Sequence, residues 1–218
     1  MSAGGGVEAL YPFLYEGGAE AAAVLDEVRA STVRKAAEIV ALRQSLADLL
    51  GDGLVACARR MAGAFLDGGR LFAFGNGGSC TDAQDLAQMF LHPPQGRPLP
   101  AFSLTGDVAA LTALSNDVGF EVVFARQLAA FGRRGDVAVG LSTSGGSANV
   151  LRAFDEASRR GMVTVGFAGY GGGAMAEAGT VDHLFVVPSS SVHRIQEAQT
   201  TAYHVLWELT HQALDDRL

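Results

Sequence analysis

The sequence contains few of the residues on which several protein classes depend. Among its 218 residues it has two cysteines, Cys57 and Cys80, and neither lies in a CxxC or Cys/His cluster. This excludes a disulfide framework and argues against a structural zinc site, and it fits a reducing cytoplasm. Lys and Arg total 16 against 23 Asp and Glu, a net charge of −7, so general nucleic-acid binding is disfavoured.

The sequence also lacks long apolar segments. No run reaches the roughly 18 residues that a membrane span needs. The first nine residues are rich in Gly and contain no Lys or Arg ahead of an apolar stretch, unlike a secretory signal. We therefore expect a cytoplasmic protein that has no membrane partner.

Residues 19–65 contain no Pro and repeat apolar residues at helical intervals, for example Leu25, Val28 and Ile39. We predict an N-terminal helical pair within residues 1–68, broken near Gly51 and Gly53 because glycine is unfavourable inside a helix. This segment is expected to form a homo-oligomer. Packing of the helices against the chain's own sheet is the alternative.

After Gly69 short apolar runs alternate with helical stretches. Continuous apolarity is typical of strands covered on both faces, and the spacers are long enough for helical crossovers. We therefore predict an α/β fold with a doubly wound, parallel, five-stranded sheet, formed by residues 69–218 as one folding unit. Ligands of such sheets bind beyond the carboxyl ends of the strands. The predicted strands are Leu71–Phe74, Ala101–Leu104, Val137–Leu141, Thr164–Ala168 and His183–Val187.

The first motif is Gly75-Asn76-Gly77-Gly78-Ser79, between the first predicted strand and a helix expected over Thr81–Phe90. Closely spaced glycines allow the backbone to approach a ligand, and a helix start favours an anion. The motif lacks the P-loop lysine and the full GxGxxG pattern. A purely structural Gly-rich turn remains an equal alternative.

The second motif is Ser142-Thr143-Ser144-Gly145-Gly146-Ser147, between another strand and a helix expected over Ala148–Arg159. Four hydroxyl groups at a helix N-terminus offer donors to a phosphate without any cationic side chain. A helix cap needs only one hydroxyl, so simple capping explains the pattern less well. Together the two loops indicate a small ligand that carries a phosphate and further hydroxyl groups.

The third motif lies on the expected C-terminal helix, within Ser191–Leu218, and contains Gln196 and His204. Eight residues at about 100° each leave these two side chains within roughly 80° of one another, on one helix face. A lone His among apolar neighbours is more often a core residue than a functional one. The presence of Gln196 and the two loops favours a functional role.

These motifs resemble the SIS (sugar isomerase) domain, and within it the phosphoheptose isomerase family. The resemblance spans about 140 residues, roughly 71–212. It is carried by the two loops, by Ser115–Phe120 with Phe124–Gln127, by Arg134-Gly135-Asp136, by Ala148-Asn149-Val150 and by Arg194-Ile195-Gln196-Glu197.

The resemblance implies a flavodoxin-like SIS fold, and a homotetramer assembled by the N-terminal helices, with sites that use more than one subunit. It implies His204 as the catalytic acid or base. It also implies that a sugar phosphate is held by the two loops, by a pair of residues between them and by the C-terminal helix. The expected substrate-binding residues are Asn76, Gly77, Gly78, Ser79, Asn116, Asp117, Ser142, Thr143, Ser144, Ser147 and Gln196.

The sequence departs from the family on the helix after the Gly-rich loop. There the family carries a His that binds zinc in some members and, one turn later, a Glu that moves the proton between two sugar carbons. These positions are Asp85 and Met89 here, and Met cannot accept a proton. Asp85 is our candidate for the base, and Asp82 is expected to be a helix-start residue. If zinc binds, its ligands would be Asp85, Gln196 and His204.

We predict an aldose–ketose isomerase that acts on a seven-carbon sugar phosphate through a cis-enediol. Such a reaction needs an acid/base pair and no redox cofactor, so no cofactor is required, although zinc stays possible. The alternative is a non-catalytic SIS module that binds a sugar phosphate and a protein partner, of the type that associates with a bacterial replication initiator. A dinucleotide-dependent oxidoreductase is disfavoured because no acidic residue follows the Gly-rich loop at the required distance.

Overall fold

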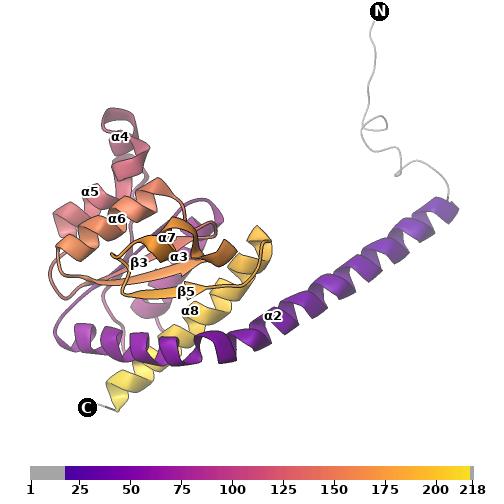
Figure 1. Ribbon diagram of the computed structural model, residues 1–218, viewed down its shortest axis with the longest axis horizontal. Helices are drawn as coiled ribbons and strands as arrows, with labels where there is room; N and C mark the ends of the chain where they lie inside the picture. Colours follow the sequence, from indigo (N-terminus) through magenta and orange to yellow (C-terminus); the bar gives the residue numbers. More distant parts are fainter. Residues whose placement is uncertain (1–17, 217–218) are drawn as a thin grey trace, which may run out of the picture. The chain divides into compact units, whose positions relative to one another are not determined.

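The computed structural model describes residues 18–216 and shows an α/β fold built on one parallel sheet (Figure 1). Its five strands are arranged in the order β2-β1-β3-β4-β5, and every neighbouring pair is parallel. All five predicted strands are confirmed to within one residue at each end. They are β1 Leu71–Gly75, β2 Ala101–Ser103, β3 Val137–Ser142, β4 Val163–Ala168 and β5 His183–Val186.

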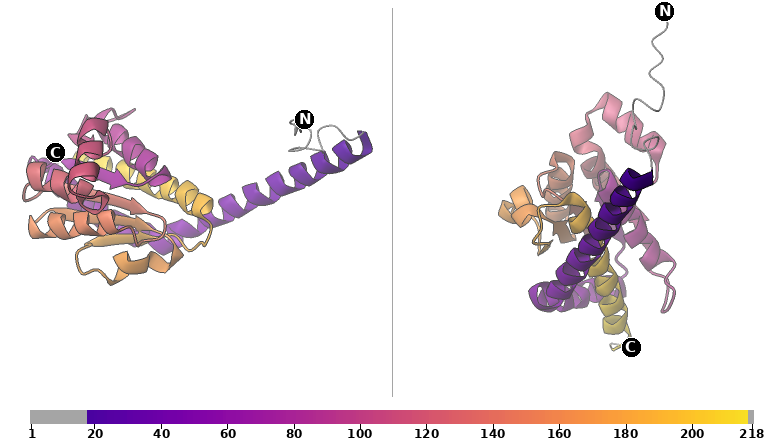
Figure 2. Two further views of the ribbon diagram at one scale, coloured as in Figure 1. Left: turned by 90° about the horizontal axis from the view of Figure 1, so that it is seen from above. Right: turned by 90° about the vertical axis from the view of Figure 1, so that its right-hand side faces the viewer.

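Helices cover both faces of this sheet (Figures 1 and 2). One core cluster joins the C-terminal part of α2 (Gly18–Leu66) with α3 (Gly78–Leu91) and α8 (Val192–Asp215). The other joins the opposite face of the sheet with α5 (Val123–Phe131), α6 (Ala148–Arg159) and α7 (Gly173–Glu177). The central strands β1, β3 and β4 are buried at every residue, which explains their continuous apolarity. The doubly wound architecture is thus confirmed.

The predicted helical pair is one continuous helix, α2, so the expected break at Gly51 and Gly53 is wrong. Two glycines cost about 1 kcal/mol each inside a helix relative to Ala. Leu50 and Leu54 on either side are buried in the core, and an added Cβ at Gly53 would lie 3.3 Å from the Phe185 ring. Packing against β5 therefore outweighs the local preference of the glycines.

The chain divides into two compact units, residues 1–41 and 42–218. The first contains the N-terminal part of α2, and the second contains the sheet with all the other helices. The predicted boundary between residues 68 and 69 remains a prediction. Among residues 18–216, no helix is long and apolar enough to span a membrane.

Three short elements complete the fold, α4 (Val108–Asp117), η2 (Phe120–Val122) and η3 (Tyr170–Gly172).

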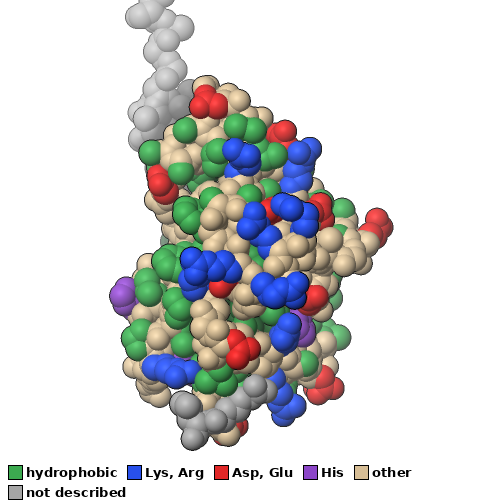
Figure 3. All heavy atoms as spheres, turned by 90° about the vertical axis from the view of Figure 1, so that its left-hand side faces the viewer, with side chains coloured by type: hydrophobic (Ala, Val, Ile, Leu, Met, Phe, Trp, Pro, Cys, Tyr) green, Lys and Arg blue, Asp and Glu red, His purple; other side chains and the backbone are tan. Residues whose placement is uncertain are grey.

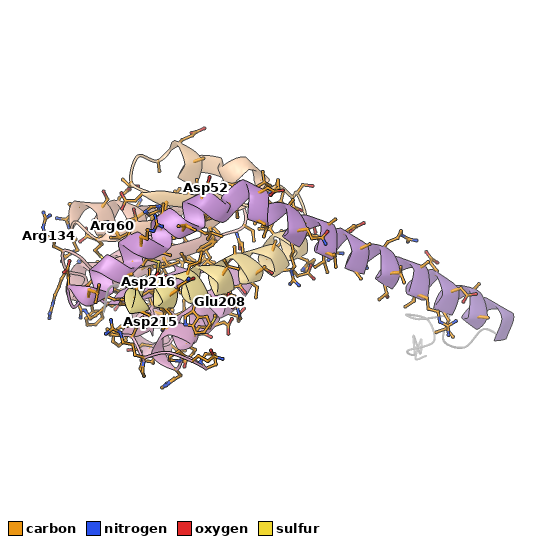
Figure 4. All side chains as sticks on the ribbon, turned by 90° about the horizontal axis from the view of Figure 1, so that it is seen from below. Asp52, Arg60, Arg134, Glu208, Asp215 and Asp216 are labelled. Atoms are coloured by element: carbon orange, nitrogen blue, oxygen red, sulfur yellow. The ribbon has the colours of Figure 1, made fainter. Side chains whose placement is uncertain are left out.

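The loops at the two ends of the strands differ in the charge of their side chains. Arg70, Arg134 and Arg160 lie within the three residues before β1, β3 and β4, and Arg side chains are prominent on this amino-end face (Figure 3). Figure 4 shows Glu208, Asp215 and Asp216 on the exposed side of α8. Neither the Gly-rich loop nor the Ser-rich loop, both at the carboxyl ends, carries a charged side chain.

Candidate active site at the carboxyl ends of the strands

The Gly-rich loop turns directly from β1 into α3, and a side chain of α8 covers it. Gly77 has a φ of 56°, a conformation that favours glycine. A Cβ on Gly78 would collide with the amide group of Gln196. The helix starts at Gly78 rather than at the predicted Thr81. Gly78 thus allows Gln196 to lie against the loop.

The Ser-rich loop gathers its hydroxyl groups at the N-terminus of α6. Ser142 Oγ lies 2.9 Å from Ser147 Oγ and 3.5 Å from Ser144 Oγ. Gly145 has a φ of 65° and lies against the backbone of Gly172. Ser147 occupies the N-cap position but makes no capping bond with its side chain. Clustered hydroxyls at a helix N-terminus form a ready site for a phosphate.

A pair of amide side chains joins the two loops. Asn76 Nδ2 donates to Asn149 Oδ1 at 2.8 Å, and Asn149 Nδ2 donates to Asn76 Oδ1 at 2.9 Å. Asn149 is 3% exposed in the first turn of α6. Sequence reasoning treated Asn149 as part of a motif and did not assign it a site role. The pair fixes the spacing between the Gly-rich loop and the Ser-rich loop.

Asp85, Tyr203 and His204 form a cluster between α3 and α8. The Tyr203 hydroxyl donates to Asp85 Oδ2 at 2.8 Å, and His204 Nε2 lies 3.5 Å from the same oxygen. Burial raises the pKa of the Tyr203 hydroxyl, so it stays a hydrogen-bond donor. The side chains of Asp85 and His204 are about half exposed, 53% and 48%. A carboxylate and an imidazole accessible to a ligand therefore lie side by side.

Asp82 is placed differently from the prediction. It is the fifth residue of α3, not a helix-start residue, because the helix begins at Gly78. Its Oδ2 atom is buried and has no hydrogen-bond partner. Burial, and secondly the charge of Asp85, raise its pKa to about 6. A buried carboxyl group whose pKa is raised by burial and by a neighbouring charge is a candidate for function.

The residues near His204 do not fit a typical zinc site. Zinc sites in proteins use three or four ligands from Cys, His and carboxylate side chains. Asp85 and His204 supply two such ligands, and Met89 packs against the apolar core. Among residues 18–216, no group of three or more His, Cys, Asp or Glu side chains is arranged to hold a metal ion. The third zinc ligand would have to be the side-chain amide of Gln196.

Among the other predicted residues, all of which the structure describes, Asn116 and Asp117 make no hydrogen bond to the Gly-rich and Ser-rich loops, whereas Ser79 and Thr143 are part of them. Asn116 and Asp117 lie at the C-terminal end of α4, and Asn116 Nδ2 donates to Asp117 Oδ1 at 2.8 Å. Ser79 is 4% exposed and lies in the first turn of α3. The Thr143 carbonyl accepts from the Gly169 amide, which links the Ser-rich loop to the end of β4. The phosphate-type loops, Gln196 and the Asp85–His204 pair are the parts brought together.

Two cavities lie away from these loops. One, of about 800 Å³, is lined by residues of β2, α4 and α5, including Phe102 and Phe131. The other, of about 540 Å³, lies beside Trp207 and Asp215 on α8. Neither includes the Gly-rich loop, the Ser-rich loop, Asp85 or His204. The arrangement of donors, rather than cavity size, identifies the candidate site.

Comparisons with known proteins agree with this geometry. The SIS domain family model matches residues 34–169. The chain is 42% identical over 193 residues to a phosphoheptose isomerase of Roseiflexus sp., an alignment that covers 88% of this chain and 93% of the relative. It is 41% identical over 186 residues to a phosphoheptose isomerase of Aquifex aeolicus, which covers 84% and 95%.

Solved structures give the same result. The phosphoheptose isomerase GmhA from Neisseria gonorrhoeae superposes with a TM-score of 0.79 at 36% identity, covering 85% of this chain and 99% of that one. A phosphoheptose isomerase from Francisella tularensis has a TM-score of 0.79 at 31% identity, covering 87% and 98%. The chain therefore belongs to the SIS domain family and, within it, to the phosphoheptose isomerases.

Proposed function

We propose that the protein is an aldose–ketose isomerase of sugar phosphates, acting on sedoheptulose 7-phosphate or a close relative through a cis-enediol. One observation carries this proposal. The Asn76–Asn149 pair joins the start of α6, beside the Ser-rich loop, to the Gly-rich loop, which leads directly into the helix that holds Asp85 beside His204. The loop that would hold the phosphate and the proposed acid/base pair are thus joined through this amide pair. The phosphoheptose isomerases to which the chain is similar suggest the seven-carbon substrate.

The reaction moves one proton between neighbouring carbons and another between their oxygens. His204 is suited to the oxygen side because an imidazole gives and takes protons near neutral pH. A carboxylate of α3 would move the proton between the two carbons, and Asp85 is the candidate from the sequence analysis. Gln196, lying against Gly78, would orient the hydroxyl groups of the sugar. These roles need no redox cofactor, and we propose that none is required.

The direct test is a coupled assay with sedoheptulose 7-phosphate, run with and without added zinc. We expect turnover in both conditions. Turnover only with zinc would show that the reaction needs the metal and would contradict the proposal that no cofactor is required. A protein that binds the sugar phosphate without turning it over would contradict the isomerase proposal.

The second candidate function is a non-catalytic SIS module that binds a sugar phosphate and a protein partner. The observation in its favour is Met89, which stands at the position of the family's proton-carrying Glu. Met89 is partly buried against the core and has no group that can exchange a proton. Binding of the sugar phosphate in the absence of turnover would favour this module.

The phosphate is expected at the Ser-rich loop, so Ser144→Ala should weaken binding of sugar phosphates. Ser144 is exposed, close to Ser142, and not engaged in the core. A hydrogen bond to a charged group contributes roughly 1.5–3 kcal/mol, so the Kd should rise about tenfold to a hundredfold. Isothermal titration calorimetry measures the change, with Ser158→Ala near the far end of α6 as the control. An unchanged Kd for Ser144→Ala would contradict this placement of the phosphate.

We propose that the protein is a homo-oligomer, a tetramer by resemblance, assembled through the N-terminal part of α2. Within residues 18–41, Leu25, Val28, Val33 and Val40 are each more than half exposed, from 54% to 69%. Regularly spaced exposed apolar residues indicate an interaction surface. Light scattering at micromolar concentration should give a multiple of 22.6 kDa. A monomeric mass would refute the assembly.

A further inference from the structure

Helices α3 and α8 run side by side, and matching their residues shows which part of α8 lies opposite Asp82. Gln196 lies against Gly78, and Tyr203 bonds Asp85, seven residues further along both helices. The two helices therefore advance together, about 10.5 Å over these seven residues. Asp82 is four residues after Gly78 and three before Asp85, on the same side of α3. In this register Asp82 is level with Gln199 and Thr200 of α8, between the Gly-rich loop and the Asp85–His204 pair.

The surroundings of Asp82 are unlike those of a structural carboxylate. Its Oδ2 atom is buried without a hydrogen-bond partner, and the opposed Gln199 is 0% exposed with neither amide atom partnered. Buried polar groups are nearly always hydrogen bonded, so each exception needs an explanation. Two such exceptions at one level of the α3–α8 contact indicate that this position is kept for function rather than stability.

The two carboxyl groups of α3 have unequal environments. Asp85 is half exposed, and its Oδ2 accepts a hydrogen bond from Tyr203 and lies beside His204. Asp82 is more buried and its pKa is raised to about 6, by burial first and by the charge of Asp85 second. A base whose pKa lies near the working pH is the most effective in proton transfer. When neighbouring carboxyls differ in this way, they take different roles.

We propose that Asp82 is the catalytic carboxylate that exchanges the carbon-bound proton, and that Asp85 is a positioning residue that orients His204. The Asp82 carboxylate accepts the proton from the carbon next to the carbonyl, and the C–H electron pair forms the enediol double bond. His204 gives a proton to the carbonyl oxygen. Asp82 then gives its proton to the former carbonyl carbon, and His204 takes a proton from the hydroxyl group on the neighbouring carbon. Both side chains end in their starting states, so no oxidant or reductant is consumed. This assignment rests on the proposed isomerase function and replaces Asp85 as the carbon base.

The test compares Asp82→Asn with Asp85→Asn, and uses Asp48→Asn on an exposed turn of α2 as the control. With sedoheptulose 7-phosphate, Asp82→Asn should lower kcat about a hundredfold or more, because general-base catalysis contributes about that factor at least. The Kd for the sugar phosphate should stay within about threefold. Asp85→Asn should keep measurable turnover, and Asp48→Asn should behave as wild type.

The pH profile separates a catalytic role from a structural one. The titratable groups that act on Asp82 are Asp85 on its own helix and Tyr203 on α8, and His204 lies beside Asp85. Because the ionised form of Asp82 is the active one, wild-type kcat/KM should rise with pH, with the midpoint of the rise at about pH 6. Asp85→Asn removes the charge that raises the pKa of Asp82, so this rise should move to lower pH. It should be absent from the residual activity of Asp82→Asn.

Each outcome decides between the alternatives. Asp82→Asn activity within threefold of wild type, or an unchanged pH rise in that variant, would overturn the assignment and leave the isomerase function standing. No turnover by the wild type would reject the proposed function itself, and the assignment with it. If Asp82→Asn does not fold, the profiles of wild type and Asp85→Asn decide, because a rise that does not move in Asp85→Asn contradicts the proposal.

Discussion

His204→Ala is expected to lower kcat/KM for a sugar phosphate by about a hundredfold to ten-thousandfold, the usual contribution of an acid/base side chain. The imidazole is 48% exposed and lies 3.5 Å from Asp85 Oδ2. Its removal takes away the group that serves the oxygen side of the reaction. The Ser-rich loop is on a different strand and helix, so the Kd for the sugar phosphate should change little.

A coupled kinetic assay and calorimetry of the same preparation measure the two quantities. His92→Ala is a suitable control because His92 is exposed at the C-terminal end of α3. Substitution of a half-exposed side chain should change stability by less than about 0.5 kcal/mol, so loss of activity by unfolding is separable by thermal denaturation. Retention of near wild-type kcat by His204→Ala would exclude this residue from the acid/base pair.

Asp136→Ala is expected to destabilise the protein by about 3–5 kcal/mol, the cost of leaving a buried ion pair without one partner. Asp136 is 2% exposed, and its Oδ2 accepts from Arg70 Nη2 at 2.8 Å and from the Arg133 amide at 2.9 Å. Its Oδ1 accepts from the Arg70 amide at 2.9 Å. The carboxylate therefore ties the start of β1 to the turn before β3, the two strands that carry the site loops.

For a chain of this size, 3–5 kcal/mol corresponds to a fall in Tm of about 6–20 °C. Thermal and urea denaturation followed by circular dichroism measure it. Asp48→Ala, an exposed substitution on α2, should stay within about 0.5 kcal/mol of wild type. A comparable stability of Asp136→Ala and Asp48→Ala would show that the buried network does not hold the strands together.

The sheet was predictable because its signal is local. Strands buried on both faces, such as Val137–Ser142, must be apolar at every position, and the sequence shows this directly. The Ser-rich loop was equally visible because its four hydroxyl residues lie within six consecutive positions. The continuity of α2 was not predictable, since glycine preference at Gly51 and Gly53 is local whereas the packing that overrides it involves β5.

The parts of the site that were missed depend on contacts between distant segments. The Asn76–Asn149 pair joins residues 73 positions apart, and no spacing rule predicts it. Asp82 was expected to be a helix-start residue because the glycines before it suggested a later start of α3. Whether Asp82 or Asp85 is the more buried depends on how α3 packs against α8. The apolar pattern of one helix does not predict that packing.

The most direct measurement of the central claim is proton NMR of sedoheptulose 7-phosphate incubated with the protein in D2O. An isomerase that works through an enediol converts the C1 methylene group of the ketose into the aldehyde carbon of the aldose, so the C1 proton signals should decline and an anomeric proton signal should appear in a protein-dependent manner. His204→Ala should suppress the loss. Signals that persist at full intensity, while calorimetry shows the sugar phosphate bound, would contradict the account and leave a sugar-phosphate-binding module in its place.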